Sequence, residues 1–291
     1  MTAPAALVAV TVVWGFTFVP VKDAVDVYPV LSFNAVRFAI ASAALALVAG
    51  RRLAMLGRGG LARGIALGLL LAAGYELQTA GLDLTTVSST GFITGKYVVL
   101  TPLIGLVLFR SRIGLQAWAG VALATAGLAL LSGIQAGSAA GDLLVLAGAA
   151  VYSLQIVLME RYAPRYDPLA FTLAEMLAAA GGFAVAALAF GQLGTPRGST
   201  VWFALVVTGV FASALAYLVQ TWAQRRTSAA RTALAFTMEP VFAALFGYAL
   251  AGDRLGVSGW LGGALIVTGI LAAEPAAAAL LARLVRRPRP A

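Results

Sequence analysis

The chain has 291 residues, of which 61% are hydrophobic and 11% are charged, and it carries 20 basic and 11 acidic residues. Soluble domains are roughly 45–50% apolar and about 25% charged, so this composition excludes a water-soluble fold and indicates an integral membrane protein. Because the chain has neither Cys nor His, a disulfide scaffold and the usual soft metal ligands are excluded, and we expect no metal and no cofactor.

Ten apolar runs with the length of a membrane-spanning helix follow one another along the chain. A helix that crosses roughly 30 Å of hydrocarbon needs about 20 apolar residues, whereas the strands of outer-membrane barrels alternate over roughly ten. We therefore predict an all-α membrane protein with ten transmembrane helices and no room for a soluble catalytic domain. The predicted spans are 3–21, 30–50, 63–83, 89–109, 114–133, 143–160, 168–191, 200–223, 228–250 and 256–279.

Basic residues gather in alternate loops, which indicates the orientation of the chain. The basic-poor loops hold Lys22, Arg197 and Arg254. Positive charge favours the cytoplasmic side, so we predict a multi-pass protein of the inner membrane with both termini in the cytoplasm. The positive charge is then a signal of topology, and we expect no nucleic-acid partner. The basic-rich loops and the tail hold Arg51, Arg52, Arg58, Arg63, Arg110, Arg112, Arg161, Arg165, Arg225, Arg226, Arg283, Arg286, Arg287 and Arg289.

The two halves of the chain resemble one another. Pro102 and Pro240 stand 138 positions apart, and each is followed by a short turn and a Trp, Trp118 and Trp260, before another apolar run. Each half holds five predicted helices, and because five is odd the second half enters the membrane from the opposite side. Inverted repeats of this kind are typical of secondary transporters. We predict two inverted five-helix repeats, 1–138 and 139–275, and a basic cytoplasmic tail, 276–291, on anionic headgroups.

Several local motifs resemble a known family. They are the run Trp14-Gly15-Phe16-Thr17-Phe18, Pro29 with Arg37, and the stretch 233–274 with its Glu-Pro pair and Gly-rich last helix. The chain is similar to the drug/metabolite transporter superfamily, in its ten-helix EamA branch. This resemblance implies movement of small metabolites, amino acids or drugs by alternating access. Asp253 stands where the family usually has Glu, so we assign that turn no transport role.

Three charged residues lie at one predicted depth. Arg37, Glu76 and Lys96 are each seven residues from the outer end of their span, which places them roughly 10 Å below the surface. Ionisable groups inside the membrane are costly and usually pair. We predict a Glu76–Lys96 or a Glu76–Arg37 pair, and two roles stay open: a group beside the substrate, or an ion pair that locks three helices.

Glu239 lies near the middle of its span and directly precedes Pro240. Proline frees the carbonyl of Phe236 and kinks a helix. A carboxyl at such a kink can bind a cationic group or carry a proton; the alternative is a hydrogen-bonded carboxyl packed on a neighbouring helix. We expect a structural role for Glu175, paired with Arg231.

Polar stripes on the predicted helices indicate further candidates. Polar or aromatic side chains recur at helical spacing, which places them on one face, toward polar neighbours. Either an interhelical hydrogen-bonding seam or a substrate wall explains such a face. Together with the charged groups, the candidate substrate-binding residues are Trp14, Asn34, Arg37, Glu76, Lys96, Tyr152, Gln155, Tyr217, Gln220 and Glu239.

These observations predict a secondary transporter that exports a small organic metabolite across the inner membrane by alternating access. The expected partners are a small-molecule substrate and the lipid bilayer, and coupling to protons or to a second solute is left open. The alternatives are a non-coupled channel or facilitator and a membrane sensor. An enzyme is disfavoured because the chain contains neither an HExxH nor a GxSxG motif.

Overall fold

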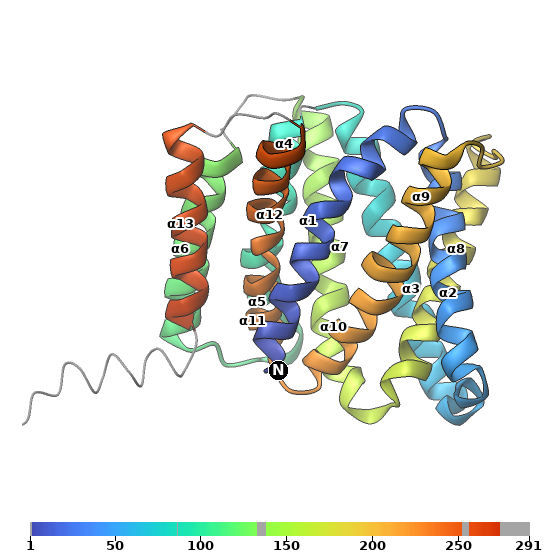
Figure 1. Ribbon diagram of the computed structural model, residues 1–291. Helices are drawn as coiled ribbons and strands as arrows, with labels where there is room; N and C mark the ends of the chain where they lie inside the picture. The colour runs from blue at the N-terminus through green and yellow to red at the C-terminus, as the bar shows by residue number, and fades with distance from the viewer. Residues whose placement is uncertain (1, 86, 133–137, 252–255, 274–291) are drawn as a thin grey trace, which may run out of the picture.

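The computed structural model describes residues 2–85, 87–132, 138–251 and 256–273, and every regular element in them is a helix (Figure 1). The predicted all-α class is therefore confirmed. The basic tail, Asp253 and the end of the last predicted span lie outside the described residues. The helices are α1 (Ala3–Val25), α2 (Val30–Ala49), η1 (Gly50–Leu56), α3 (Gly57–Leu82), α4 (Val87–Thr94), α5 (Tyr97–Phe109), α6 (Leu115–Ser132), α7 (Ala139–Tyr162), η2 (Ala163–Arg165), α8 (Pro168–Ala189), α9 (Ser199–Val207), η3 (Thr208–Leu215), α10 (Ala216–Gln224), α11 (Ala229–Phe236), α12 (Met238–Phe246), η4 (Gly247–Ala251) and α13 (Val257–Ala273).

Eight helical stretches in the described residues are long and apolar enough to cross a membrane. One of them, Val30–Leu82, has 53 residues and joins α2, η1 and α3. The chain turns within it, because Gly57 adopts a φ of 60° at the end of η1, and α2 and α3 both extend from η1 toward the opposite end of the bundle (Figure 1). The last helix, α13, is shorter, with 17 residues.

The Pro240 helix is interrupted where the sequence predicts. α11 ends at Phe236 and α12 begins at Met238. Between them the amide of Thr237 donates to the carbonyl of Leu234 at 3.2 Å, three residues back instead of four. Proline has no N–H to bond the carbonyl of Phe236 four residues earlier, and the helix is interrupted there, beside Glu239.

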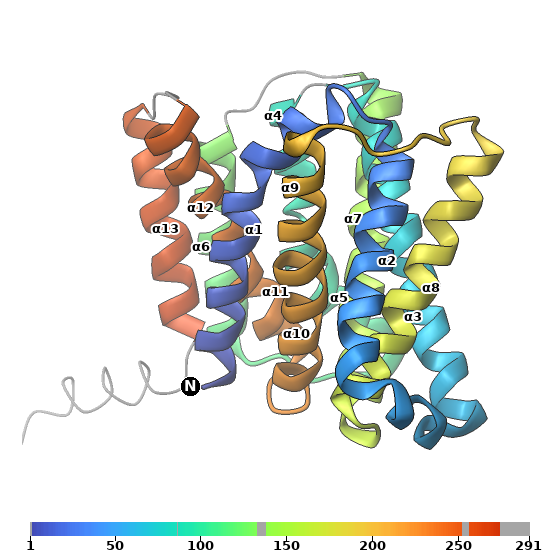
Figure 2. The same cartoon turned by 45° about the vertical axis from the view of Figure 1, so that its right-hand side comes forward.

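The helices form two outer groups with the rest between them (Figures 1 and 2). α6 and α13 pack against each other on one side, and α2, α3 and α8 lie on the other. The pair of α6 and α13 makes backbone contact: a Cβ at Gly127 would lie 2.5 Å from the carbonyl oxygen of Gly262, and one at Gly120 would lie 2.6 Å from that of Gly269. Small residues allow this close approach between membrane helices.

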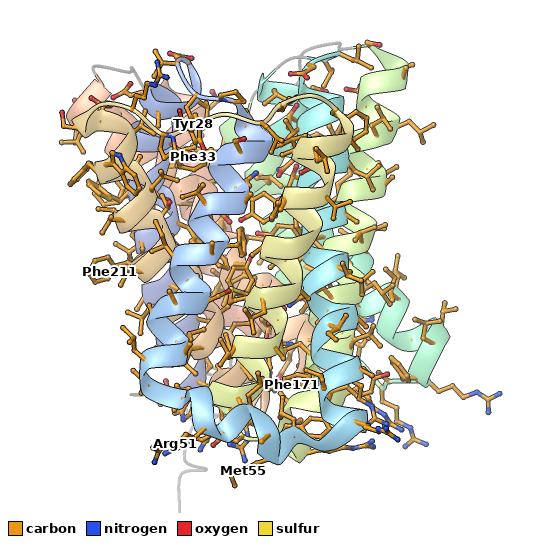
Figure 3. The ribbon with its side chains drawn as sticks, turned by 90° about the vertical axis from the view of Figure 1, so that its right-hand side faces the viewer. Tyr28, Phe33, Arg51, Met55, Phe171 and Phe211 are labelled. Atoms are coloured by element: carbon orange, nitrogen blue, oxygen red, sulfur yellow. The ribbon has the colours of Figure 1, made fainter. Side chains whose placement is uncertain are left out.

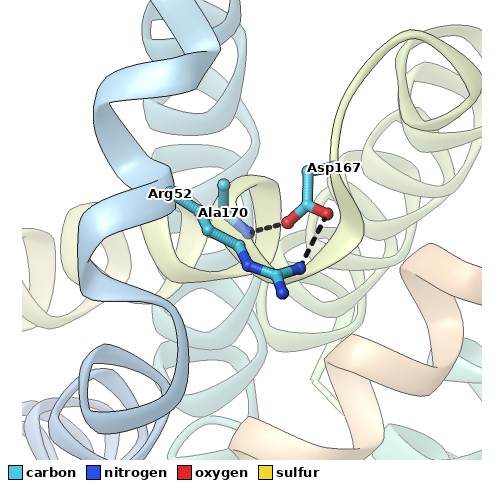
Figure 4. A network of polar contacts seen from close by, with 3 residues as sticks. All are labelled: Arg52, Asp167 and Ala170. Atoms are coloured by element: carbon cyan, nitrogen blue, oxygen red, sulfur yellow. Dashed lines mark hydrogen bonds and ion pairs between the residues drawn. The ribbon is translucent and has the colours of Figure 1, made fainter.

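One end of the bundle, which carries η1 and the N-terminus, is rich in arginine, and we call it the basic end. In Figure 3, Arg51 and Met55 of η1 point away from the bundle there. Asp167 caps α8 by accepting from the amide of Ala170 at 3.1 Å, and it forms an ion pair with Arg52 at 3.3 Å (Figure 4). This contact ties η1, which follows α2, to the start of α8.

The opposite end joins the same two helices without charge. The Tyr28 hydroxyl donates to the carbonyl of Gly194 at 3.2 Å, and the Ser32 hydroxyl donates to the carbonyl of Gln192 at 2.6 Å. Burial raises the pKa of the Tyr28 phenol. α2 and α8 are thus packed along their length and tied at both ends.

Candidate functional site

Arg37 on α2 is buried, with 6% of its surface exposed. Its Nε donates to the Ser213 hydroxyl of η3 at 2.8 Å, and its Cζ lies 5.4 Å from the ring centre of Phe38 and 5.8 Å from that of Tyr75. A guanidinium beside aromatic rings gains about 2 kcal/mol when desolvated. The N–H groups that these contacts leave free can bind an anionic group in a forked geometry.

Aromatic rings from seven helices form a connected group beside Arg37. The Trp14 indole donates to the carbonyl of Ala212 at 2.8 Å, and its ring centre lies 4.9 Å from that of Phe236 and 5.8 Å from that of Tyr217. Further ring pairs, with centres 5.1–6.3 Å apart, link this group to α2, α3, α7 and α8. We call this group the aromatic cluster: Trp14, Phe38, Tyr75, Tyr152, Phe183, Tyr217 and Phe236.

Two carboxyl groups adjoin the aromatic cluster. The Glu239 carboxyl interacts electrostatically with Arg37 and also with the Tyr152 phenol. Glu76 follows Tyr75 on α3, and its buried Oε1 has no hydrogen-bond partner among the described residues. Together, the aromatic cluster, Arg37 and the two carboxyl groups provide apolar walls, a cation and hydrogen-bond acceptors, which is the composition of small-molecule sites.

Neither predicted pair of Glu76 is formed, so that prediction is wrong. The ion pair between described residues is that of Arg52 with Asp167. Arg37 turns toward Ser213 and the rings, and Lys96 lies over the Phe92 ring at 5.1 Å. Residues at equal depth lie on one level of the bundle, but they face each other only if their helices are rotated suitably. Arg37 contacts Tyr75 on α3, and Glu76, the next residue, points about 100° around the helix axis from Tyr75.

A second polar group lies between α7, α8 and α10. Gln155 Nε2 donates to Glu175 Oε1 at 2.7 Å, and Gln220 Nε2 donates to Gln155 Oε1 at 3.2 Å and to Gln224 Oε1 at 2.9 Å. Gln224 in turn donates to the carbonyl of Ile156 at 2.8 Å. Gln220 and Gln224, which share one polar face of α10, thus form a hydrogen-bonding seam with Gln155 of α7. We call these three residues the glutamine chain: Gln155, Gln220 and Gln224. The predicted pairing of Glu175 with Arg231 is wrong, because Glu175 bonds to this chain instead.

The structure therefore divides the predicted site residues. Trp14, Arg37, Tyr152, Tyr217 and Glu239 are brought together, with Glu76 beside them. Asn34 is buried one turn from Arg37 on the same helix, Gln155 and Gln220 belong to the glutamine chain, and Lys96 stands apart, near Asp142.

Sequence reasoning missed several residues of the site. Tyr75 and Ser213 both contact Arg37, and they stand 138 positions apart, the spacing that relates Pro102 to Pro240. That spacing was a usable signal. Gln78 was also missed: it accepts from the Tyr152 hydroxyl at 3.2 Å and donates to Thr94 at 2.8 Å.

Comparisons with known proteins identify the family and support the fold. An uncharacterized transporter of Archaeoglobus fulgidus is 33% identical over 270 residues, covering 91% of this chain and 83% of the relative. The uncharacterized inner membrane transporter YedA of Escherichia coli K12 is 28% identical over 273 residues, which cover 91% of this chain and 88% of YedA. One crystal structure at 22% identity superposes with a TM-score of 0.78 over 99% of this chain and all of that chain, which supports the fold. The EamA-like transporter family matches residues 1–133 and again 139–273, so the chain belongs to that family.

Proposed function

We propose that this protein is a secondary transporter that exports a zwitterionic organic solute with an apolar body, such as an amino acid or a related metabolite, by alternating access. The observation that carries the proposal is the buried Arg37, which interacts with Glu239 and lies among aromatic rings of several helices. Arg37 suits a carboxylate, Glu239 suits an ammonium group, and the rings suit an apolar side chain.

Ten spans in two inverted repeats fit this proposal. At about 1.5 Å per residue, the 53-residue stretch Val30–Leu82 would be far longer than a bilayer of about 30 Å, and its turn at η1 divides it into two spans. Counting α13 as a further span then gives ten. The double match of one family within the chain supports the duplication, as do the reciprocal glycine contacts of α6 and α13, the fifth helix of each proposed repeat.

The orientation follows from charge. Arg51 lies at the basic end, which also holds the N-terminus (Figures 1 and 3). Arg52 belongs to the same element, η1, and Arg63 to the first turns of α3, which follows it. Basic loops stay in the cytoplasm. We therefore assign the basic end to the cytoplasm and the Tyr28 end to the outside.

A matched set of three solutes tests the proposed chemistry: phenylalanine, phenethylamine without the carboxylate, and 3-phenylpropionate without the amine. We expect phenylalanine to stabilise the purified protein against heat at the lowest concentration. A lost charge-assisted hydrogen bond is worth about 1.5–3 kcal/mol, or roughly 10–150-fold in affinity. Arg37→Gln should weaken phenylalanine and 3-phenylpropionate but spare phenethylamine, and Glu239→Gln should do the reverse.

Lys96→Met is the matched control, because Lys96 is another cation predicted at the depth of Arg37 but lies over Phe92. Its affinities should equal those of the wild type. Solutes that bind are then tested for saturable counterflow in proteoliposomes and for loss from preloaded cells. Ohmic conductance without counterflow would contradict a carrier and favour a channel.

A further inference from the structure

Glu175 is a buried acid outside the aromatic cluster. Its side chain is 0% exposed. Oε1 accepts one hydrogen bond, from the neutral amide of Gln155 at 2.7 Å, and the buried Oε2 has no hydrogen-bond partner in the part of the chain that the structure describes. A buried carboxylate with a single neutral donor is strongly disfavoured. A further cation or hydrogen-bond donor is therefore needed at Glu175 Oε2.

No side chain in the described part of the chain supplies that species. α3 meets α8 at this level through Gly68, whose added Cβ would overlap the carbonyl oxygen of Glu175. Among the described residues, Glu175 forms neither an ion pair nor a hydrogen bond with an ionisable group. The ionisable groups on the elements packed against it are Arg37 on α2, Arg51 and Arg52 on η1, Arg58, Arg63, Tyr75 and Glu76 on α3, Asp142, Tyr152, Glu160, Arg161 and Tyr162 on α7, and Tyr217 on α10.

Within the glutamine chain, Gln220 has no N–H left for Glu175. Gln220 Nε2 donates to both Gln155 and Gln224, and the buried Gln220 Oε1 has no partner. Two buried acceptors, Glu175 Oε2 and Gln220 Oε1, thus lack a donor. Hard metal cations take six or more oxygen ligands, and two unoccupied oxygens fall short of that number. A proton on Oε2 removes the charge and creates a donor.

We propose that Glu175 is the proton-binding site of this transporter. A hydronium ion in cytoplasmic water gives its proton to Oε2, so that an O–H bond forms, the carboxylate becomes a carboxylic acid and a water molecule remains. When that O–H bond later breaks, the proton returns to a water molecule and the carboxylate is restored. Gln224 ends α10 at the basic end, so the glutamine chain leads from that end toward Glu175. The inference rests on the proposed function, because only a carrier has a solute flux to couple.

The site can act on solute binding through its helices. α8 packs along α2, which carries Arg37, and α10 carries both Gln220 and Tyr217 of the aromatic cluster. Protonation at Glu175 changes the hydrogen bonds between α7, α8 and α10. These helices also contribute Tyr152, Phe183 and Tyr217 to the aromatic cluster, so the Glu175 site and the aromatic cluster are built on the same three helices.

Infrared difference spectroscopy between two pH values tests the proton site without any solute. We expect the purified wild-type protein in liposomes to show a carboxylic-acid carbonyl band that titrates with pH. Glu175→Gln should lose this band, and Glu76→Gln and Glu239→Gln should keep it. A band that persists in Glu175→Gln overturns the proposal, and so does a band removed by sodium at constant pH. If Glu175→Gln does not fold, Gln155→Leu must shift the band, and an unshifted band overturns the proposal.

A transport measurement separates this inference from the proposed function. In proteoliposomes loaded with a pH dye, phenylalanine counterflow and phenylalanine-driven proton movement are recorded together. Glu175→Gln should keep counterflow and lose proton movement to the level of protein-free liposomes. Coupled proton movement in Glu175→Gln overturns the proton site, whereas a wild-type protein with the infrared band but without counterflow supports the site and contradicts the proposed function.

Discussion

Gly68 of α3 is a position where one added methyl group should force two helices apart. A Cβ there would overlap the carbonyl oxygen of Glu175 and would lie 2.7 Å from the Cβ of Ala178 and 3.0 Å from the amide nitrogen of Ala179. Two of these three atoms belong to the backbone of α8, so they cannot rotate away. Gly68→Ala must therefore move α3 or α8 as a whole.

The expected cost follows from two opposing effects. Overpacking costs about 1–3 kcal/mol, and the better helix propensity of Ala offsets roughly 0.5–1 kcal/mol of it. A net destabilisation of about 1–2 kcal/mol should lower the melting temperature by roughly 2–8 °C in a chain of this size. Thermal unfolding of the purified wild-type and variant proteins in the same detergent measures this change in melting temperature.

Gly181→Ala is the matched control, because it adds the same methyl group to α8 where no atom lies within 4 Å of the new Cβ. We expect its melting temperature to equal or slightly exceed that of the wild type. If Gly68→Ala melts together with Gly181→Ala, the close contact between α3 and α8 does not exist and the reasoning is refuted.

Two further predictions concern the ends of the α2–α8 pair. Asp167→Ala should destabilise the protein by about 1 kcal/mol, because it removes the N-cap hydrogen bond to the amide of Ala170. Arg52→Ala should cost less than about 0.5 kcal/mol, because the ion pair that it removes is exposed. Equal melting temperatures of the two variants would contradict the role of Asp167 as a cap. Burial raises the pKa of Tyr28, so the unfolded chain ionises first and the stability from Tyr28 falls as the pH rises above about 10. Tyr28→Phe should lose the bond to Gly194 but remove this alkaline fall, and parallel stability curves across that pH range would contradict the prediction.

The sequence was sufficient for the fold class and for the break at Pro240, because both depend on local chemistry. Apolar run length reports membrane crossing directly, and a missing N–H interrupts a helix in any context. The turn at η1 was placed less well. The third predicted span begins at 63, whereas α3 begins at Gly57, because the polar, Arg-rich turn of that helix lowers its hydropathy.

The site was predicted in its composition but not in its pairing. The sequence gives the depth of a side chain along its span. The direction in which the side chain points around the helix, and the helix that it meets there, depend on how the helices pack. The sequence predicts that Glu76 pairs with Arg37 or with Lys96, but α2 packs on α8 and η3, which brings Ser213 to Arg37. The stripe on α10 left a seam and a substrate wall open, and only the positions of Gln155 and Glu175 favour the seam.

Arg37 and Glu175 occupy corresponding places in the two proposed repeats and have opposite charge. Each lies seven residues from the start of its helix, α2 or α8, and these helices begin at opposite ends of the bundle. On the proposals above, solute and proton therefore bind in opposite halves and do not compete for one carboxylate. Coupling must then pass through the packed pair of α2 and α8. Gly68→Ala, which moves α3 against α8 at Glu175, should weaken phenylalanine-driven proton movement before it weakens phenylalanine binding; loss of binding first would place the coupling elsewhere.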